Sequence, residues 1–384
     1  MNKVGRNDKC WCGSDLKYKK CHLESDQRTG TTRIVEPVDF TREDIARELK
    51  RHFGKKYCLH PLASKKTCSG EIIKAHTVQK SGGLSSIARD GHVYCVQKDF
   101  NQYANNNGKL AVKYEGISRA STFTGFCSGH DKTFFSHLED EHFQPTDEQV
   151  FLLTFRAVAR ELYCKRAAYE LRRFHDKLAK QTHVAEFEAH IKIFNDGIKK
   201  GLNDIESIKY KLDKVYKFGE FNRIKYYIIE FDEIPSVACS GAIFVENDFT
   251  GRALQVLDKD LINPVLIAFS LLRIESSGFA ILSWLDNNDI CDEFIKSLNA
   301  LPRKTLSNAL TRFAFEYFEN LFISPDWWEQ LEEKTKMALM ARLSYSINIF
   351  NERNVYCLMD DGISYADWQF KRVTSNVINS DTCP

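Results

Sequence analysis

The sequence predicts an α+β fold made of several domains. Its 384 residues exceed the usual size of a single domain. Two long segments near the middle of the chain space their apolar residues as helices do, and several β-like runs follow them. Residue types that commonly bind metals lie mainly at the start, because seven of the twelve Cys and eight of the eleven His precede residue 143. These observations separate a Cys/His-rich first third from a larger α+β body.

The chain divides at changes in composition. Residues 1–24 form a short Cys/His-rich segment, and residues 25–40, which are polar and contain Gly and Pro, are typical of a linker. Residues 41–144 contain short elements interrupted by Gly-rich and Asn-rich turns, as expected of a small loop-rich domain that needs extra stabilisation. Residues 145–384 form the body.

The body begins with helices and continues with strands. Thr146 followed by Gln149 predicts a capping box, and residues 150–178 then keep helical spacing without Gly or Pro. A second stripe of apolar residues, from Leu202 to Val215, predicts a partner helix and therefore an antiparallel helical hairpin. Strands are predicted at 225–231, 236–246, 263–274 and 278–285, the last two pairing antiparallel across a turn, and helices follow at 289–298, 305–322 and 326–346.

The overall charge indicates little about partners. The net charge is +2, so bulk electrostatics do not indicate a nucleic-acid binder, although residues 42–80 hold ten Lys/Arg against four Asp/Glu. No apolar run reaches the roughly 18 residues of a transmembrane helix, and the first nine residues, MNKVGRNDK, lack the apolar core of a signal peptide. We therefore expect no membrane partner and a cytoplasmic location, where paired cysteines bind metal more often than they form disulfides.

The first candidate metal site lies at the N-terminus. Cys10, Cys12, Cys21 and His22 have the spacing C-x-C-x8-C-H, and two ligand pairs separated by a short loop suit tetrahedral Zn²⁺. Residues 1–24 are too few to bury a core, so a bound ion must supply their folding energy. The alternative is that four unrelated residues fall together in a disordered tail, and the tight spacing disfavours it.

The stretch GRNDKCWCGSDLKYKKCH, residues 5–22, resembles the SEC-C zinc motif, which is found at the C-terminus of the SecA translocase and in many other bacterial proteins. The resemblance includes the four ligands and the KYKKCH ending, while Trp11 stands where the family usually has Pro. It implies a bacterial protein with a small zinc module that docks a protein partner. It does not imply translocation, because the chain contains no G-x-x-x-x-G-K-[ST] phosphate loop.

A second group of candidate ligands lies within residues 41–144. Cys127 and His130 form a C-x2-H pair that fits one helical turn, and Cys58 and Cys68 bracket a short loop. His60 and His76 compete with these residues for any one position. The sequence therefore predicts a second structural zinc that holds together, or staples, the loop-rich domain. Two zinc ions per chain are expected in all, one in a small N-terminal zinc knot and one in the zinc-stapled domain.

Residues 58–135 also bear a weak resemblance to HNH (ββα-metal) nuclease domains. EIIKAHTV predicts a strand ending at His76, where that family has its general base, and FCSGHDKTFF is similar to its metal-binding helix, with His130 replacing the second cysteine. The resemblance implies that Asp131 is a ligand of a catalytic Mg²⁺ or Mn²⁺. The sequence departs from the family at Ala75, where a metal-binding residue normally precedes the His, and it shows only one of the two usual cation ligands.

Basic residues surround the second group of ligands. Together they predict a surface that contacts phosphates, whereas for any single side chain an ordinary solvated position is the alternative. The predicted nucleic-acid-binding residues are Lys55, Lys56, Lys65, Lys66, Lys74, Lys80, Arg119 and Lys132.

Three functions remain open from the sequence. The leading hypothesis is a zinc-binding protein that contacts DNA, RNA or a nucleoprotein. A role in defence against foreign DNA is expected from the multidomain architecture and not from any residue. The first alternative is a metal-dependent HNH-like endonuclease, so the sequence leaves open whether the chain is an enzyme. The second alternative is a zinc-scaffolded docking adaptor without catalysis.

Overall fold

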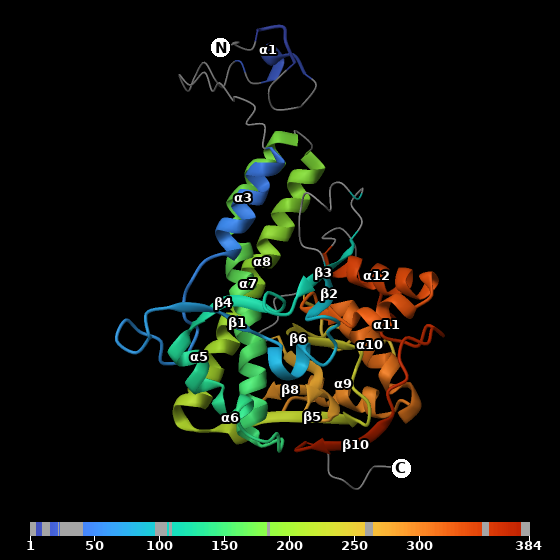
Figure 1. The fold of residues 1–384 in the computed structure, drawn as a ribbon. Helices are drawn as coiled ribbons and strands as arrows, with labels where there is room; N and C mark the ends of the chain where they lie inside the picture. Colours follow the sequence, from blue (N-terminus) through green and yellow to red (C-terminus); the bar gives the residue numbers. More distant parts are fainter. Residues whose placement is uncertain are drawn as a thin grey trace.

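A β-sheet between two layers of helices forms the centre of the molecule. The structure is a computed structural model that describes residues 5–9, 16–21, 23, 41–96, 106, 110–182, 185–257, 264–347 and 353–377. The long helices α7 (Asp147–Thr182) and α8 (Ala185–Phe218) pack as an antiparallel hairpin against one face of the sheet. The opposite face is covered by α9 (Asp289–Asn299), α10 (Leu306–Tyr317) and α12 (Glu333–Ile347) (Figure 1).

The central sheet has eight strands, and every neighbouring pair is antiparallel. Their order is β10-β5-β8-β7-β6-β9-β2-β3. The strand bounds are β2 (His92–Val96), β3 (Val112–Gly116), β5 (Ile224–Phe231), β6 (Val237–Phe244), β7 (Leu266–Ile274), β8 (Ser277–Leu285), β9 (Leu321–Ile323) and β10 (Phe370–Ser375).

Both faces of the central strands are buried, which explains their nearly continuous apolar sequences. Side chains of a strand alternate between the two faces. On β5, Tyr227 and Ile229 therefore join the core beneath the C-terminal helices, while Tyr226 and Ile228 join the core beneath the hairpin. Burial of both faces needs apolar residues at odd and even positions alike.

The first third of the chain is built into the same cores as the body. β2 extends the central sheet through β9, where Tyr94 pairs with Ile323. The core under the hairpin also contains Leu59 and Phe126 from the first third together with Phe155 and Leu212 from the hairpin. The predicted boundary at residue 144 is thus crossed by a shared hydrophobic core and by a shared sheet.

A smaller unit in the first third carries most of the candidate functional residues. β1 (Ile72–His76) pairs antiparallel with β4 (Thr122–Cys127), and α5 (Ser128–Phe134) follows β4 directly. We call residues 54–81 and 122–135, for which the sequence predicts a zinc site, the zinc-binding unit. In the chain, α3 (Arg42–Phe53), which packs on α7, precedes this unit, the π-helix η1 (Lys80–Leu84) begins at the end of its first segment, and α6 (Ser136–Glu139) follows its second segment. Farther along the chain, the 3-10 helix η2 (Phe221–Arg223) contacts α7 and α8.

The structure confirms the helical hairpin and the four predicted body strands, with boundaries shifted by a few residues. The Thr146 hydroxyl accepts the N–H of Gln149 at 3.2 Å, which is one half of the predicted capping box. The side-chain oxygen of Gln149 accepts the N–H of Gln144 at 3.0 Å. Two helix predictions were partly wrong. The segment 305–322 leaves the helix at Phe318, because residues 321–323 pair with β6 and β2 as β9. The segment 326–346 is split by extended backbone at Leu331 into α11 (Pro325–Gln330) and α12.

No helix in the described part of the chain combines the length and the apolar character needed to cross a membrane.

Candidate metal centre

Three cysteines and one histidine from separate segments meet in the zinc-binding unit. The segment of Cys58 runs beside β4, since the Leu59 N–H donates to the Gly125 carbonyl at 2.8 Å. Cys68 closes the following loop, and its N–H donates to the Ser64 carbonyl at 3.0 Å. Cys127 is the last residue of β4, and His130 lies in the first turn of α5. The C-x2-H spacing thus places both residues at one strand-to-helix junction.

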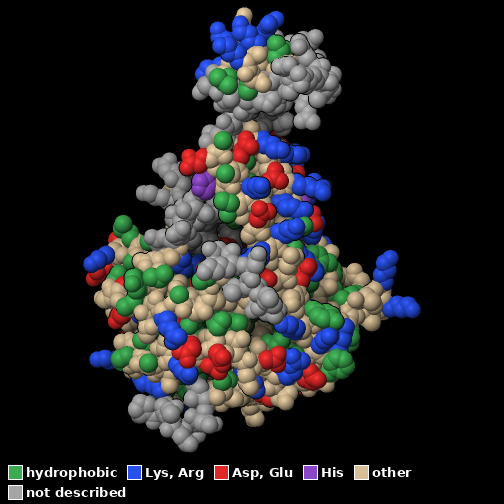
Figure 2. Space-filling view, turned by 180° about the vertical axis from the view of Figure 1, so that it is seen from behind, with side chains coloured by type: hydrophobic (Ala, Val, Ile, Leu, Met, Phe, Trp, Pro, Cys, Tyr) green, Lys and Arg blue, Asp and Glu red, His purple; other side chains and the backbone are tan. Residues whose placement is uncertain are grey.

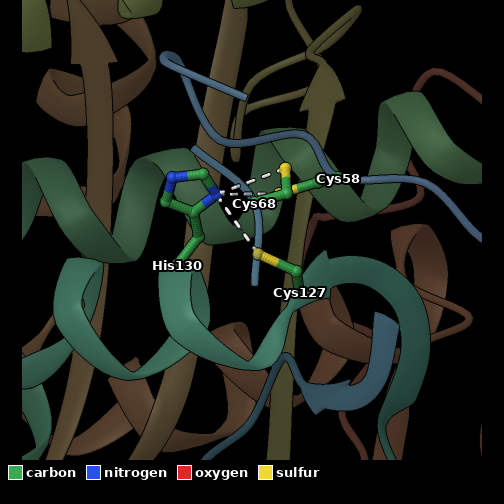
Figure 3. Close-up of side chains that lie close together, drawn as sticks. All are labelled: Cys58, Cys68, Cys127 and His130. Carbon is green, nitrogen blue, oxygen red and sulfur yellow. Dashed lines mark hydrogen bonds between the residues drawn. The ribbon is translucent and has the colours of Figure 1, made fainter. Parts of the chain in front are cut away.

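The geometry of the four side chains matches a tetrahedral zinc site. All four ligand atoms lie within 4.8 Å of one another. His130 Nδ1 lies 3.4 Å from the Cys58 sulfur, 3.7 Å from the Cys68 sulfur and 3.3 Å from the Cys127 sulfur (Figure 3). Tetrahedral zinc with Zn–S of about 2.3 Å and Zn–N of about 2.0 Å separates a ligand nitrogen from a ligand sulfur by about 3.5 Å. The observed separations bracket that value, so the residues fit the ion.

Hydrogen bonding alone does not explain this arrangement. A neutral imidazole nitrogen has either one N–H or one lone pair, so it makes one good hydrogen bond. Three sulfurs surround the single Nδ1 of His130, which is more than one nitrogen can hydrogen-bond, and a central cation would serve all four groups at once. Zn²⁺ suits a set of three sulfurs and one nitrogen, whereas Mg²⁺ and Ca²⁺ prefer oxygen.

Local electrostatics differ between the thiols. Burial raises the pKa of the Cys58 thiol to about 11, although N–H groups of Cys127 and His60 act in the opposite direction. Burial also tends to raise the pKa of Cys127, but the N–H groups of His130 and Ser69 outweigh it and lower this pKa to about 7. The N–H of Ser69 lies 3.5 Å from the Cys127 sulfur. A bound divalent cation stabilises the thiolate form at both positions.

His60 is close to the centre but is not one of the four ligands. Its ring stacks on that of His130, with centroids 4.0 Å apart and planes 9° from parallel. Its Nδ1 accepts the N–H of Leu62 at 3.2 Å, which directs that nitrogen away from a metal. Burial, followed by the nearby charges of His130 and Lys209, lowers the pKa of His60 to about 3, so the ring is neutral at physiological pH. His60 therefore packs against the imidazole of His130 as a neutral ring.

His76 also lies outside the four-residue group. It is the half-buried last residue of β1, and its Nε2 donates to the carbonyl of Ile117 at 3.0 Å. Burial lowers the pKa of His76 and raises that of Asp131. Within the described residues, the close Cys/His/Asp/Glu group contains neither His76 nor Asp131. Their catalytic roles stay predictions.

The eight predicted basic residues fall into two sets. Lys55 is 3.5 Å from a carboxylate oxygen of Glu170, and Arg119 is 2.7 Å from one of Glu115, so both are ion-paired. The other six are exposed, and the structure shows no ion pair for them among the residues that it describes. They are Lys56, Lys65, Lys66, Lys74, Lys80 and Lys132.

Sequence reasoning missed the structural roles of two neighbours of the ligands. Ser69 directly follows Cys68, and its hydroxyl meets that of Ser128 at 2.9 Å, joining the Cys68 loop to the start of α5. His60 was treated only as a competing ligand. Its position two residues after Cys58 was the available signal, but stacking on His130 depends on the tertiary fold.

The fold and this centre define an α+β protein with a Cys3His group of the kind that binds zinc. A family model for the SEC-C motif, which is a metal-binding motif, matches residues 6–24. Of the four ligands predicted there, the structure describes Cys21, the last residue of α1 (Tyr18–Cys21), while Cys10, Cys12 and His22 lie outside the described residues. Searches of curated proteins and of solved structures found no match to the chain.

Proposed function

We propose that the protein binds nucleic acid through a basic surface shaped by the zinc centre. One observation carries the proposal: residues 54–81 hold six lysines against one acidic residue, Glu71. Five of these lysines are exposed without an ion pair in the described structure, a state that favours contact with phosphates. Lys65 and Lys66 lie in the loop between two zinc ligands, so a bound ion would fix the position of their backbone.

The charge of the whole molecule makes this local excess informative. Over the larger, lower part of the face seen in Figure 2, Lys and Arg side chains are interspersed with Asp and Glu, whereas basic side chains gather at its upper end. A net charge of +2 gives no general attraction to a polyanion. Binding to nucleic acid would therefore depend on the lysines of the zinc-binding unit.

Binding of a labelled short DNA or RNA duplex, measured by fluorescence anisotropy across a salt series, tests the proposal. Lys65→Glu combined with Lys66→Glu should weaken binding and reduce the salt dependence by about one unit of slope for each phosphate that is no longer neutralised. The matched control is Lys304→Glu with Lys334→Glu, which makes the same charge change at exposed sites on other elements. Equal losses of affinity in both double variants, or no binding by the unmodified protein, would contradict the proposal. The latter outcome favours the docking adaptor.

A metal-dependent nuclease is the second candidate, and one arrangement favours it. The antiparallel β1–β4 pair continues directly into α5, and His76 ends β1, as the HNH resemblance implies. Incubation with plasmid DNA or with RNA in Mg²⁺ or Mn²⁺ decides between binding and cleavage. Our proposal expects no cutting. Cutting that His76→Ala abolishes would replace it with the nuclease, and a role in defence against foreign DNA would then be tested by phage challenge.

A further inference from the structure

A polar cavity lies where the first third of the chain passes into the hairpin. Its volume is 260 Å³, and its lining comes from α6, the start of α7 and the connection between them. His137, His142 and Glu148 are among the lining residues, whereas none of the four residues of the Cys58–His130 centre is. Imidazole nitrogen and carboxylate oxygen are common ligands of divalent metals. We call this space the His137–His142 cavity.

One buried side chain holds the two histidines together. Gln149, in the first turn of α7, is 4 % exposed and also lines the cavity. Its Nε2 donates to the carbonyl of His137 at 3.0 Å and to the carbonyl of His142 at 2.9 Å. A single amide nitrogen thus fixes the backbones of both histidines, so their imidazoles reach the cavity from neighbouring positions.

Both imidazoles present Nε2 as a candidate metal ligand. His137 Nδ1 donates to a carboxylate oxygen of Glu141 at 2.6 Å, and His142 Nδ1 donates to one of Glu275 at 2.7 Å. An ionised carboxylate only accepts, so each Nδ1 carries a proton, and Nε2 of the neutral ring keeps its lone pair. A carboxylate behind one ring nitrogen is the usual support of a histidine that binds metal through the other.

The local charge favours a cation. Residues 137–149 contain five Asp/Glu and no Lys or Arg, and Glu275 adds a sixth carboxylate from the β7–β8 turn. One of the five, Glu139, pairs with Arg156 at 2.6 Å. Among the described residues, no group of three ligand atoms lies within 4.8 Å here. The protein therefore offers two imidazoles and leaves the other coordination positions to water, unlike a closed structural site.

We propose that the His137–His142 cavity binds an exchangeable divalent transition-metal ion through Nε2 of its two histidines, with Glu141 and Glu275 orienting the rings. Imidazole ligands suit Ni²⁺ and Zn²⁺, whereas Mg²⁺ prefers sites made of oxygen alone. The open positions of such an ion can accept an oxygen ligand. This inference depends neither on nucleic-acid binding nor on zinc at the Cys58–His130 centre.

Nickel binding to the full chain, without an affinity tag and already loaded with zinc, tests the inference by isothermal titration calorimetry. Glu275→Gln should weaken binding of Ni²⁺ by about tenfold, as is common when the carboxylate behind a ligand histidine is lost. His142→Ala removes a ligand and should cost more. His142 has 87 % of its side chain exposed, so the variant removes no core packing. His190→Ala is the matched control at an exposed histidine of α8 and should leave the affinity unchanged.

The nickel coordination separates this cavity from the cysteine sites. X-ray absorption should show nitrogen and oxygen neighbours and no sulfur. Sulfur neighbours, or an affinity that His137→Ala combined with His142→Ala leaves unchanged, would overturn the inference. An unmodified protein that binds no nickel would overturn it as well.

Discussion

Replacing Cys68 with serine removes one ligand while leaving the hydrophobic core untouched, because Cys68 is half-buried and lies in a loop. If the other three ligands retain the ion, the variant reopens the ten-residue loop between Cys58 and Cys68. Treated as a cross-link, closure of a loop of that length contributes about 3 kcal/mol. If the ion is lost completely, the longer loop from Cys58 to Cys127 is also opened, and the stabilisation that its closure provides, about 4 kcal/mol, is lost in addition. We therefore expect the zinc-binding unit to lose at least about 3 kcal/mol.

Hydrogen–deuterium exchange measures this loss locally. Tryptophan fluorescence is less suitable, because Trp284, Trp328 and Trp368 lie in the other core. Amides paired between β1 and β4 should lose about 100-fold in protection, since each 1.4 kcal/mol is a factor of ten. Amides of β7 and β8 serve as the internal reference.

Cys164→Ser is the matched control, because Cys164 is a half-buried cysteine outside the four-residue group. It should keep the zinc content and the protection of β1 and β4. The reasoning is refuted if Cys68→Ser leaves that protection unchanged. It is equally refuted if zinc-loaded and zinc-free forms of the unmodified protein exchange alike.

Three further outcomes are expected. Phe126→Ala should cost about 3 to 5 kcal/mol in urea unfolding, because Phe126 is fully buried, and a cost below about 1 kcal/mol would contradict the packing described. Arg342→Met should cost about 2 kcal/mol at neutral pH, because it removes one of two arginines beside the buried carboxylate of Glu316. Burial raises the pKa of Glu316, which means that its charged form is the one that is costly to bury. The loss of unfolding free energy in Arg342→Met should therefore shrink as the pH falls toward 5 and Glu316 becomes protonated. A loss that does not depend on pH would exclude the Glu316 carboxylate as its cause. Burial holds the Cys58 thiol protonated at neutral pH, so zinc must displace a proton to bind it. The zinc affinity measured by chelator competition should therefore fall by about tenfold, for each proton displaced, when the pH is lowered by one unit. An affinity that does not change with pH would argue against thiolate ligation.

The sequence was most informative where periodicity or short spacing controls structure. The hairpin and strands β5 to β8 follow from long apolar patterns that tertiary packing reinforces. By contrast, β9 has three residues and exists only because β6 and β2 flank it, so no local pattern predicts it. β10, which pairs with β5 from the far end of the chain, was missed for the same reason.

The candidate site also combines features that local spacing predicts with features that depend on the tertiary fold. The Cys127–His130 spacing is a local signal, and the structure brings Cys58 and Cys68 to it as predicted. The exclusion of His60 from the ligand set depends on its stacking and on the Leu62 N–H, neither of which is encoded in spacing.

The most direct test of the account is the zinc content and coordination of the full chain with its N-terminal ligands disabled by Cys10→Ser and Cys21→Ser. Elemental analysis should find one zinc per chain, and X-ray absorption should show three sulfurs near 2.3 Å and one nitrogen at about 2.0 Å. Addition of Cys127→Ser should remove that zinc. A protein that holds no zinc after the first two substitutions, or that keeps its zinc after the third, would contradict the assignment of Cys58, Cys68, Cys127 and His130 as a metal centre.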